Sequence, residues 1–373
     1  MATRSYSDPA QSTFGRTDGT VAEISFPCSI REMETLLSAD ERHMREALAE
    51  GVKGVGLTSP NPPVGAVIVR EGKTLGRGWH ERAGDPHAEV LALRDAVRQF
   101  GPDAARGATL YVTLEPCSTH GRTPPCTGAI LAAGLTRVVI GATDPNPLHA
   151  GKGVDLLREA GVEVTCGVLE RDARELIRFF SRHITTGLPW VIAKTAITLD
   201  GRTTLPPGEG QWVTSKESRD DVQFWRRQCD AILVGGETFR RDNPALTLRG
   251  KWAEGRQQPW RVILTSDPDL PETHKLFTDF HSNRTIVHEG ITFKESLARL
   301  GNLGVASVML ESGGRLFTHA LREGLVNEVI LYLAPVFGGG DHRLIPTEGI
   351  VGSLKDVEVS LIGPDIRVRG MVT

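Results

Sequence analysis

The sequence has few cysteines, no long apolar run and no large excess of charge of either sign. Five cysteines in 373 residues are too few for a disulfide framework, so we expect a reducing compartment. Apolar stretches such as 329–336 are far shorter than the roughly 20 residues that cross a bilayer, and the N-terminus has no apolar signal-peptide core. These absences predict a cytoplasmic protein without a membrane partner.

The balance of charge also narrows the choice of ligand. The chain carries 43 Lys and Arg against 46 Asp and Glu, which gives a formal net charge of −3 at pH 7. Such a chain has no general field that would attract nucleic acid. We therefore expect a small-molecule substrate and no nucleic-acid partner.

Residues 1–32 are predicted to be a flexible extension, because Ser, Thr, Gly and Asp are frequent there and no hydrophobic periodicity is present. An organelle-targeting peptide is disfavoured, since such peptides are poor in acids and Asp8, Asp18 and Glu23 interrupt this stretch. The folded part of the chain is expected to begin near residue 33.

Two α/β domains are predicted after the extension, because the length corresponds to about two units of roughly 150 residues. A helix that ends before Gly187 and Pro189 places the junction there, which gives domains at 33–186 and 187–373. Hydrophobic periodicity predicts helices at 39–50, 89–99, 127–133, 154–160, 170–184, 216–228 and 315–323. It predicts strands at 64–69, 109–114, 137–141, 162–165, 190–196, 231–235, 261–265, 308–311 and 328–334. Strands that alternate with helices at this spacing indicate parallel sheets.

A His, a Glu and two Cys form the clearest chemical pattern. His87-Ala88-Glu89 opens a predicted helix, Cys117 follows a predicted strand, and Cys126 precedes a second predicted helix. One His and two Cys suit tetrahedral zinc and leave its fourth position to water, as in a catalytic site. Placing both cysteines near helix N-termini would stabilise their thiolates. Glu89 is expected to take a proton from the water and deliver it to the leaving ammonia.

The cysteine spacing distinguishes this pattern from the common one. Zinc nucleobase deaminases share H-x-E followed by P-C-x-x-C, whereas eight residues separate Cys117 from Cys126 here. Each part alone has a simpler explanation, because His-Ala-Glu is common on helix surfaces and a single Cys is often a small buried hydrophobe. A regulatory protein with structural zinc would normally supply four ligands, so three ligands beside Glu89 favour catalysis.

In the second half an apolar strand runs into two glycines and then a helix, at Glu311-Ser312-Gly313-Gly314-Arg315. Free N–H groups at a helix N-terminus suit a phosphate, and Arg315 adds a positive charge. The pattern is not the dinucleotide fingerprint G-x-G-x-x-G, and a glycine pair after a strand is also common in plain turns. Phosphate binding and a structural turn are both compatible with it.

Longer motifs of the first half resemble one enzyme family. The stretches 60–65, 87–89 and 113–126 occur in the order found in the deaminase half of the bifunctional riboflavin-biosynthesis deaminase/reductase family, and the long insert between cysteines is that family's form. The resemblance implies a cytidine-deaminase-like, three-layer α/β/α fold. It also implies hydrolysis of the 2-amino group of 2,5-diamino-6-ribosylamino-4(3H)-pyrimidinone 5′-phosphate. Candidate substrate contacts are Asn61, His120 and Arg122, with Lys152 as a candidate phosphate contact.

Motifs of the second half resemble the reductase half of the same family, at 194–202, 208–215, 230–249 and 311–335. The resemblance implies a dihydrofolate-reductase-like α/β fold that uses NADPH to reduce the ribosyl group of the deaminated product to ribityl. The implied NADPH contacts are Ala196, Trp212, Thr238, Asp242, Gly313, Gly314, Arg315, Leu316 and Phe317. The implied substrate contacts are Lys194, Arg226, Leu246, Arg249 and Glu311. The two arginines would face one phosphate.

Two single positions depart from the family pattern, and the stretch 237–241 is bulkier and more basic than the family leads us to expect. Gly210 stands where a polar residue is common, which removes one possible substrate hydrogen bond, and Asn327 replaces the usual acid. The alternative to a two-step enzyme is therefore an active deaminase joined to a degenerate, non-reducing C-terminal domain. We expect Zn²⁺ and NADPH as cofactors, a phosphoribosyl-pyrimidine as the substrate, and a homo-oligomer.

Overall fold

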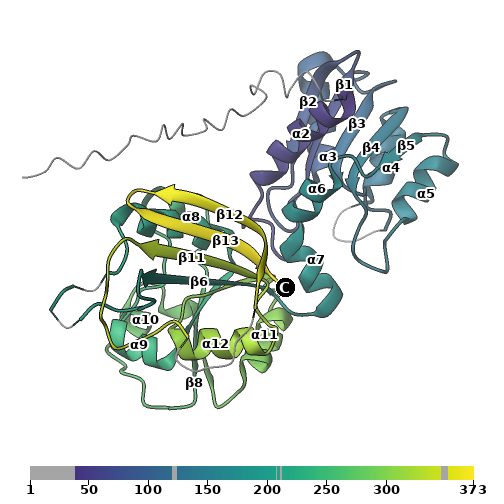
Figure 1. Cartoon of the computed structure of the whole chain (residues 1–373). Helices are drawn as coiled ribbons and strands as arrows, with labels where there is room; N and C mark the ends of the chain where they lie inside the picture. Colours follow the sequence, from purple (N-terminus) through teal and green to yellow (C-terminus); the bar gives the residue numbers. More distant parts are fainter. Residues whose placement is uncertain (1–37, 120–123, 207, 211, 346–351) are drawn as a thin grey trace, which may run out of the picture. The chain divides into compact units, whose positions relative to one another are not determined.

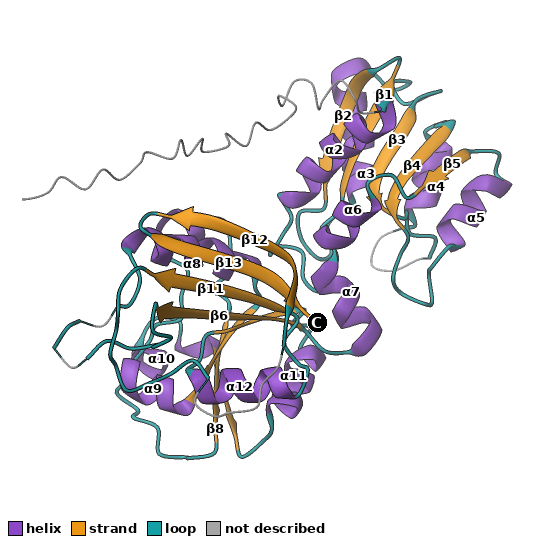
Figure 2. Cartoon of the chain, in the orientation of Figure 1, coloured by secondary structure: helices purple, strands orange, loops and turns teal. Residues whose placement is uncertain are grey.

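The computed structural model describes residues 38–119, 124–206, 208–210, 212–345 and 352–373. The predicted extension 1–32 and two candidate substrate residues, His120 and Arg122, lie outside the described residues. The described chain forms two sheets, and Figures 1 and 2 show helices packed against each of them. The predicted α/β class is therefore confirmed.

The first sheet has five strands in the order β2-β1-β3-β4-β5. Their bounds are β1 Gly65–Arg70, β2 Lys73–Trp79, β3 Thr109–Leu114, β4 Arg137–Ala142 and β5 Glu163–Cys166. Strands β3, β4 and β5 are parallel, as predicted, but β1 is antiparallel to both β2 and β3. The expectation of a wholly parallel sheet is wrong here because Glu71 and Gly72, both at positive φ, turn β1 directly into β2.

Strand β2 was not predicted from the sequence, and its two glycines explain why. Gly76 and Gly78 weaken the apolar alternation that marks a strand. Helix α3 (Ala88–Phe100) lies directly on these glycines: a Cβ at Gly76 would be 2.2 Å from Ala92 O, and one at Gly78 would be 2.4 Å from Ala88 O. The same absence of side chains that hides the strand allows the helix to approach it.

Helices cover both faces of the first sheet and form the three predicted layers. Helices α3, α4 (Cys126–Ala132) and α5 (Lys152–Glu159) contribute to the core that contains Ile68 and Val112. Helix α2 (Ala39–Val52) packs on the opposite face with Val67, Tyr111 and Val139, and α6 (Glu170–Leu176) contacts β4. The alternation of buried residues along the strands thus supplies two cores.

The helix predicted at 170–184 is two helices, α6 and α7 (Arg178–Thr186). Ile177 separates them with φ −99° and ψ 12°, and its side chain is buried in the first core. A continuous periodicity does not reveal that one apolar residue turns inward and interrupts the helix. Gly187 ends α7 in the left-handed conformation, which favours glycine.

The second sheet has eight strands in the order β12-β13-β11-β6-β10-β7-β8-β9. Their bounds are β6 Trp190–Thr198, β7 Ala231–Gly235, β8 Trp260–Thr265, β9 Thr285–Glu289, β10 Ser307–Leu310, β11 Glu328–Ala334, β12 Leu354–Ile362 and β13 Asp365–Val372. The six strands from β11 to β9 are parallel, whereas β13 runs antiparallel to β11 and β12. Strands β9, β12 and β13 were not predicted from the sequence.

Within the described residues, five α-helices and two 3-10 turns accompany the second sheet. They are α8 Lys216–Gln228, α9 Gly236–Asp242, α10 Lys275–Thr278, α11 Phe293–Asn302, α12 Gly314–Arg322, and the turns Gly250–Ala253 and Ser282–Arg284. Helices α11 and α12 share a core with Leu233 and Leu310, while α8 packs with Ile192 and Met309 on the other face. Because six strands are parallel, their carboxyl ends meet at one edge, where open α/β sheets bind ligands.

Candidate active sites

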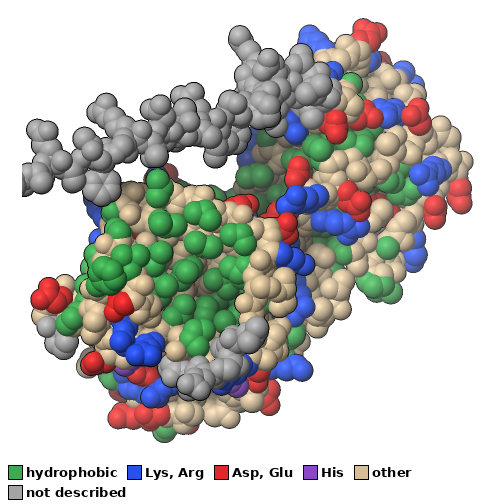
Figure 3. Space-filling model, in the orientation of Figure 1, with side chains coloured by type: hydrophobic (Ala, Val, Ile, Leu, Met, Phe, Trp, Pro, Cys, Tyr) green, Lys and Arg blue, Asp and Glu red, His purple; other side chains and the backbone are tan. Residues whose placement is uncertain are grey.

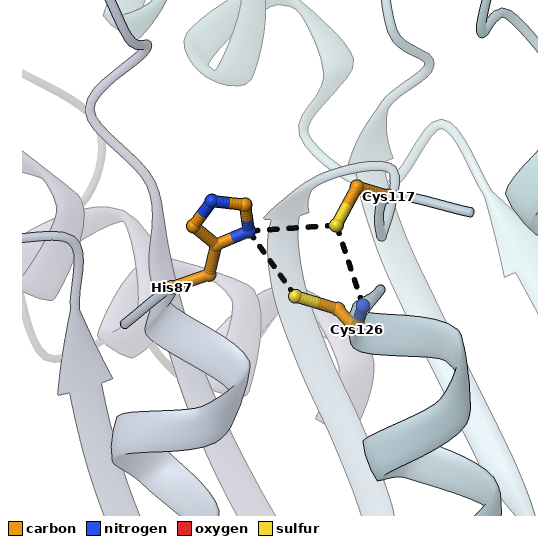
Figure 4. Close-up of side chains that lie close together, drawn as sticks. All are labelled: His87, Cys117 and Cys126. Carbon is orange, nitrogen blue, oxygen red and sulfur yellow. Dashed lines mark hydrogen bonds between the residues drawn. The ribbon is translucent and has the colours of Figure 1, made fainter. Parts of the chain in front are cut away.

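The three predicted metal ligands converge in the first half. His87 is the N-cap residue of α3, and Cys126 is the first residue of α4. The His87 Nδ1 atom lies 3.2 Å from Cys126 Sγ and 3.5 Å from Cys117 Sγ (Figure 4). All three ligand atoms lie within 4.8 Å of one another. His87 is thus brought to two cysteines that lie 30 and 39 residues further along the chain.

The expectation that both cysteines lie near helix N-termini is correct, although only Cys126 belongs to a helix. Cys117 follows Pro116 in the loop after β3, and the insert separates it from α4. Its Sγ still accepts a hydrogen bond from the Cys126 N–H at the start of α4, 3.3 Å away. Hydrogen bonding from the Cys126 thiol, together with that N–H and His87, holds the pKa of Cys117 well below its usual range.

The separations fit a zinc ion. With Zn–S near 2.3 Å and Zn–N near 2.0 Å, ligand atoms of a tetrahedral site lie roughly 3.5–3.8 Å apart. The two N···S distances of 3.2 and 3.5 Å are close to this range. His87, Cys117 and Cys126 would therefore hold the metal with three ligands.

Glu89 lies in the first turn of α3 and is 3% exposed. Burial raises the pKa of its carboxyl group, which lies beside Cys126. A raised pKa makes the carboxylate a stronger proton acceptor, which suits a group that takes a proton from water in general acid–base catalysis. The predicted proton shuttle is thus adjacent to the predicted ligands.

Asn61 lies next to a histidine that the sequence interpretation missed. The Asn61 Nδ2 atom is 3.1 Å from His80 Nε2, and His80 Nδ1 is 3.2 Å from Pro86 O. The His80 ring stands edge-on to the His87 ring, with centroids 5.2 Å apart. Burial lowers the pKa of His80, which favours the neutral ring that donates to Pro86 and accepts from Asn61. No sequence motif marked His80, because it follows the unpredicted strand β2.

Glu115 is a second residue that the sequence interpretation missed. It is 5% exposed, and its carboxylate accepts four backbone N–H bonds: from Asp144 (3.1 Å), Gly151 (3.0 Å), Gly153 (2.9 Å) and Val154 (3.4 Å). The candidate phosphate contact Lys152 is exposed and is the first residue of α5. Glu115 therefore organises the loop that carries Lys152.

In the second half, Lys194, Arg226 and Glu311 form a buried charge cluster. Glu311 Oε1 and Oε2 lie 2.6 and 3.1 Å from Arg226 Nε and Nη2, and Oε2 lies 3.2 Å from Lys194 Nζ. Burial alone would raise the pKa of Glu311, but Arg226 and Lys194 outweigh it and lower the pKa to about 2. The carboxylate is therefore ionised at any ordinary pH.

The cluster changes the expected role of one arginine. The predicted pair, Arg226 and Arg249, was expected to face one phosphate. Arg226 instead pairs with Glu311 on two nitrogens and donates from Nη1 to Thr247 O, 3.1 Å away, whereas Arg249 is exposed. Leu246, another predicted substrate contact, is 1% exposed and belongs to the core. The most accessible cation of this group is therefore Arg249.

Two glycine turns lie side by side at the carboxyl ends of β7 and β10. The Thr238 side-chain oxygen accepts a hydrogen bond from Gly313 N at 3.4 Å, and a Cβ at Gly235 would be 3.1 Å from Ser312 Oγ. Gly313 is the N-cap residue of α12, and a Cβ there would meet no atom closer than 3.9 Å. The start of α12 is therefore open beside Thr238, and the N–H groups at an open helix start suit a phosphate.

The remaining predicted cofactor residues differ in how they present their side chains. Arg315 is exposed and 3.7 Å from Glu237, and Trp212 is 55% exposed with Arg219 over its ring. By contrast, Phe317 is buried in the core, so only its backbone faces the turn. The other predicted cofactor residues have the following positions: Ala196 in β6, Asp242 paired with Arg241 at the end of α9, Gly314 packed under Arg343 O, and Leu316 partly buried.

The two departures from the family pattern have different positions. Asn327 exchanges hydrogen bonds with Val191, through its side-chain oxygen at 2.9 Å and its backbone N–H at 3.0 Å. It thereby links the amino ends of β11 and β6. These ends lie opposite to the carboxyl ends of the strands, where the glycine turns are. Gly210 has φ +101° and no atom within 4 Å of a Cβ. Gly210 belongs to the connection between the carboxyl end of β6 and α8, so of the two positions it is the one on the side of the glycine turns.

Comparisons with known proteins identify the family. A model described as "Cytidine and deoxycytidylate deaminase zinc-binding region" matches residues 37–142, and one described as "RibD C-terminal domain" matches residues 189–368. Riboflavin biosynthesis protein RibD of Aquifex aeolicus is 40% identical over 350 residues, which cover 88% of this chain and 94% of that protein. The chain belongs to the RibD family. RibD of Escherichia coli is 39% identical and covers 88% of this chain and 98% of its own length.

Solved structures agree with this assignment. The structure of Acinetobacter baumannii RibD has a TM-score of 0.80 and 38% identity, and it covers 90% of this chain and 99% of its own. A Thermotoga maritima structure, described as a diaminohydroxyphosphoribosylaminopyrimidine deaminase/5-amino-6-(5-phosphoribosylamino)uracil reductase, has the same TM-score, 34% identity and the same coverage.

Membership in the RibD family makes this chain a bifunctional enzyme of riboflavin biosynthesis, with a zinc-dependent deaminase half and a reductase half. The predicted cofactors, Zn²⁺ and NADPH, are confirmed together with the predicted enzyme class. Among the described residues, no helix is long and apolar enough to cross a bilayer.

Proposed function

We propose that the chain carries out two consecutive steps on one phosphorylated pyrimidine. The first half hydrolyses the 2-amino group of 2,5-diamino-6-ribosylamino-4(3H)-pyrimidinone 5′-phosphate. The second half reduces the ribosyl side chain with NADPH, which gives 5-amino-6-(5-phosphoribitylamino)uracil. The observation that carries the proposal is the convergence of His87, Cys117 and Cys126 beside the buried Glu89. The activity by which the Thermotoga maritima structure is described supports the choice of substrate.

In the deaminase half, the residues of the chain bind, orient and move protons. Zn²⁺ held by His87, Cys117 and Cys126 would supply a more acidic, more nucleophilic water. Glu89 takes one proton from that water and passes it to the departing amine, so that ammonia leaves as oxygen joins the ring carbon. Asn61, held by His80, orients the pyrimidine edge, and Lys152 contacts the phosphate. We assign His120 and Arg122 to the same substrate by family resemblance.

In the reductase half, positioning is the main task. NADPH supplies a hydride when bound. The turns at Thr238 and Gly313, with Arg315, would hold a cofactor phosphate, while Ala196, Trp212, Asp242, Gly314, Leu316 and the Phe317 backbone complete its site. Arg249 takes the substrate phosphate, since the Arg226 guanidinium is already occupied by Glu311 and Thr247. Lys194 and Glu311 set the charge around the sugar, and Leu246 supports the site from the core of this half.

We further propose domain boundaries at 33–186 and 187–373, after an extension at 1–32. Helix α7 ends at Thr186 with Gly187 in the left-handed conformation, and β6 of the second sheet begins at Trp190. Expression of 33–186 and 187–373 as separate chains tests the boundaries, which predict a soluble, zinc-loaded fragment and a soluble, NADPH-binding fragment. Insoluble or unfolded fragments would place the boundaries elsewhere.

A homo-oligomer in the cytoplasm completes the proposal, and an exposed apolar face supports the assembly. Val359 and Leu361 of β12 are 66% and 78% exposed, and they pair with Val368 and Ile366 of β13. Figure 3 shows an apolar area over this sheet. Apolar areas of this kind are typical of protein–protein contacts. Light scattering of the purified chain is expected to give a multiple of the 40.5 kDa chain mass, and Leu361→Asp to reduce it.

The decisive experiment is incubation of purified, zinc-loaded protein with the diaminopyrimidine phosphate, with and without NADPH, followed by mass analysis. Without NADPH we expect exchange of an amino group for oxygen. With NADPH we expect the further addition of a hydride and a proton. Deamination without reduction would support the alternative of a non-reducing second half, and no reaction in either case would overturn the proposal.

A further inference from the structure

Glu115 serves as the N-terminal cap of α5 from a distant position in the chain. Gly151, the N-cap residue of α5, has φ +81° and offers no side chain. Two N–H groups at the start of the helix, those of Gly153 and Val154, instead donate to Glu115 Oε1 at 2.9 and 3.4 Å. A carboxylate is favourable there, because it satisfies orphan N–H groups and interacts with the helix dipole.

The same carboxylate also holds the loop before α5. Glu115 Oε2 accepts hydrogen bonds from Asp144 N at 3.1 Å and from Gly151 N at 3.0 Å. One side chain therefore holds both ends of the loop 144–151. Within the loop, backbone bonds from His149 and Ala150 to Asn146 O keep the turn compact.

The loop is tied to the segment that carries a metal ligand. Glu115 is separated from Cys117 by Pro116 alone. Gly153 packs against this segment, since a Cβ at Gly153 would be 2.2 Å from Pro116 O. An ordinary N-cap serine at position 151 would cap the helix but would leave the loop unattached to Cys117. The long-range cap by Glu115 thus fixes the distance between the start of α5 and the segment that carries Cys117, which a local cap would not do.

We propose that Glu115 is a positioning residue of the deaminase, which holds Lys152 at a set distance from the metal site so that the phosphate and the reacting amine are bound together. The inference rests on the proposed function, because that function assigns Lys152 to the phosphate. The four hydrogen bonds given for the Glu115 carboxylate come from backbone N–H groups of Asp144, Gly151, Gly153 and Val154, none of which is a metal ligand. The effect of Glu115 is therefore specific to substrates that carry the phosphate.

The test compares Glu115→Gln with the wild-type full-length protein on two substrates, the diaminopyrimidine 5′-phosphate and its dephosphorylated form. The glutamine keeps the size of the side chain but directs an NH₂ group at backbone N–H donors. We expect KM for the phosphorylated substrate to rise about tenfold or more, with kcat changed less than about threefold. We expect the dephosphorylated substrate to be turned over equally well by both proteins.

Two controls separate positioning from general damage. Glu163→Gln makes the same chemical change at a 70% exposed side chain of β5 and is expected to alter neither substrate's kinetics. Reductase activity and zinc content of Glu115→Gln are expected to equal those of the wild type. Glu115→Asp keeps the charge one methylene shorter, and partial recovery of KM would support the proposal.

Three outcomes decide the matter. An equal loss on both substrates, or loss of zinc, would overturn the positioning role and leave a structural one. If Glu115→Gln does not fold, Glu115→Asp decides in its place on the same pair of substrates. Absence of deamination in the wild type would overturn the proposed function itself, and the inference with it.

Discussion

The two candidate active sites of this chain are built on opposite principles. In the deaminase half, His87 and two cysteines direct donor atoms at one point, with the buried carboxyl group of Glu89 beside Cys126. In the reductase half, Glu311 is already neutralised by Arg226 and Lys194. The first site is completed by a metal ion, whereas the second is satisfied internally and offers its backbone turns and Arg249 to the ligand. We therefore expect deamination to be lost when any one of a few residues is changed. Reduction should instead depend moderately on each of several residues.

The largest expected effect follows from this contrast and concerns Glu89→Gln. The substitution removes the proton shuttle but none of the ligands, so deamination should fall about 10³-fold while zinc remains bound. Chelation of the metal should abolish deamination altogether. Reductase activity should survive both treatments, as measured by NADPH absorbance. Substantial deamination by Glu89→Gln, with zinc present, would contradict the assigned mechanism.

The second prediction concerns Glu311→Gln, which should show that the reductase cluster is structural as well as functional. Removing the carboxylate leaves the Arg226 and Lys194 cations poorly paired, at an expected cost of about 3 kcal/mol in the free energy of unfolding. Reductase kcat/KM should fall about 10- to 100-fold, with the deaminase unchanged. Equal unfolding midpoints for variant and wild type in urea would argue against a coupled cluster.

The third prediction is a pH dependence of stability. Glu311 has a pKa of about 2 in the folded protein and about 4.5 when unperturbed, so the unfolded chain binds more protons between these values. The stabilisation is complete above pH 4.5 and is lost as the pH falls toward 2, by about 3 kcal/mol in total. Five of the six tryptophans lie in the second half, so fluorescence-monitored urea unfolding reports on it. A wild-type pH slope no steeper than that of Glu311→Gln would refute this account.

The smallest expected effect concerns the exposed charge at the glycine turns. Arg315→Ala should raise KM for NADPH about fivefold, because an exposed contact contributes about 1 kcal/mol. Deamination should not change. Lys251→Ala, another exposed cation of the same half, is the matched control. An unchanged KM would assign the phosphate to the backbone N–H groups alone.

The sequence alone was enough to predict residues whose chemical type indicates the reaction. It was not enough to predict interactions between residues that are far apart in the chain. His87, Glu89, Cys117 and Cys126 were predicted because few other functions need these types in this order. The partnership of Arg226 with Glu311 was not predicted, since the residues are 85 positions apart and either could have been solvated. Glu115 was missed for the same reason: its four donors lie 29 to 39 residues further on, in the loop before α5 and in the first turn of that helix.

The fold shows the same limit. Strands with strong apolar patterns, such as β3 and β7, were predicted with correct bounds. Strand β2 was missed because Gly76 and Gly78 replace the expected apolar residues, and β12 because its side chains are largely exposed. A local apolar pattern indicates which side chains of an element are buried. It therefore fails where a helix packs on glycines that have no side chain, or where one face of a strand is exposed.

The glycines of β2 allow α3 to pack directly on the strand backbone, and this close packing limits which substitutions the enzyme can accept in β2. A methyl group at position 78 would collide with Ala88 O, in the turn between His87 and Glu89. Any larger residue there would shift the helix outward and misplace a ligand and the proton shuttle together, although it touches neither. Libraries that aim at heat resistance by replacing glycines should therefore spare 76 and 78. Screens for lost deamination should find substitutions at these two positions, although neither residue is a metal ligand.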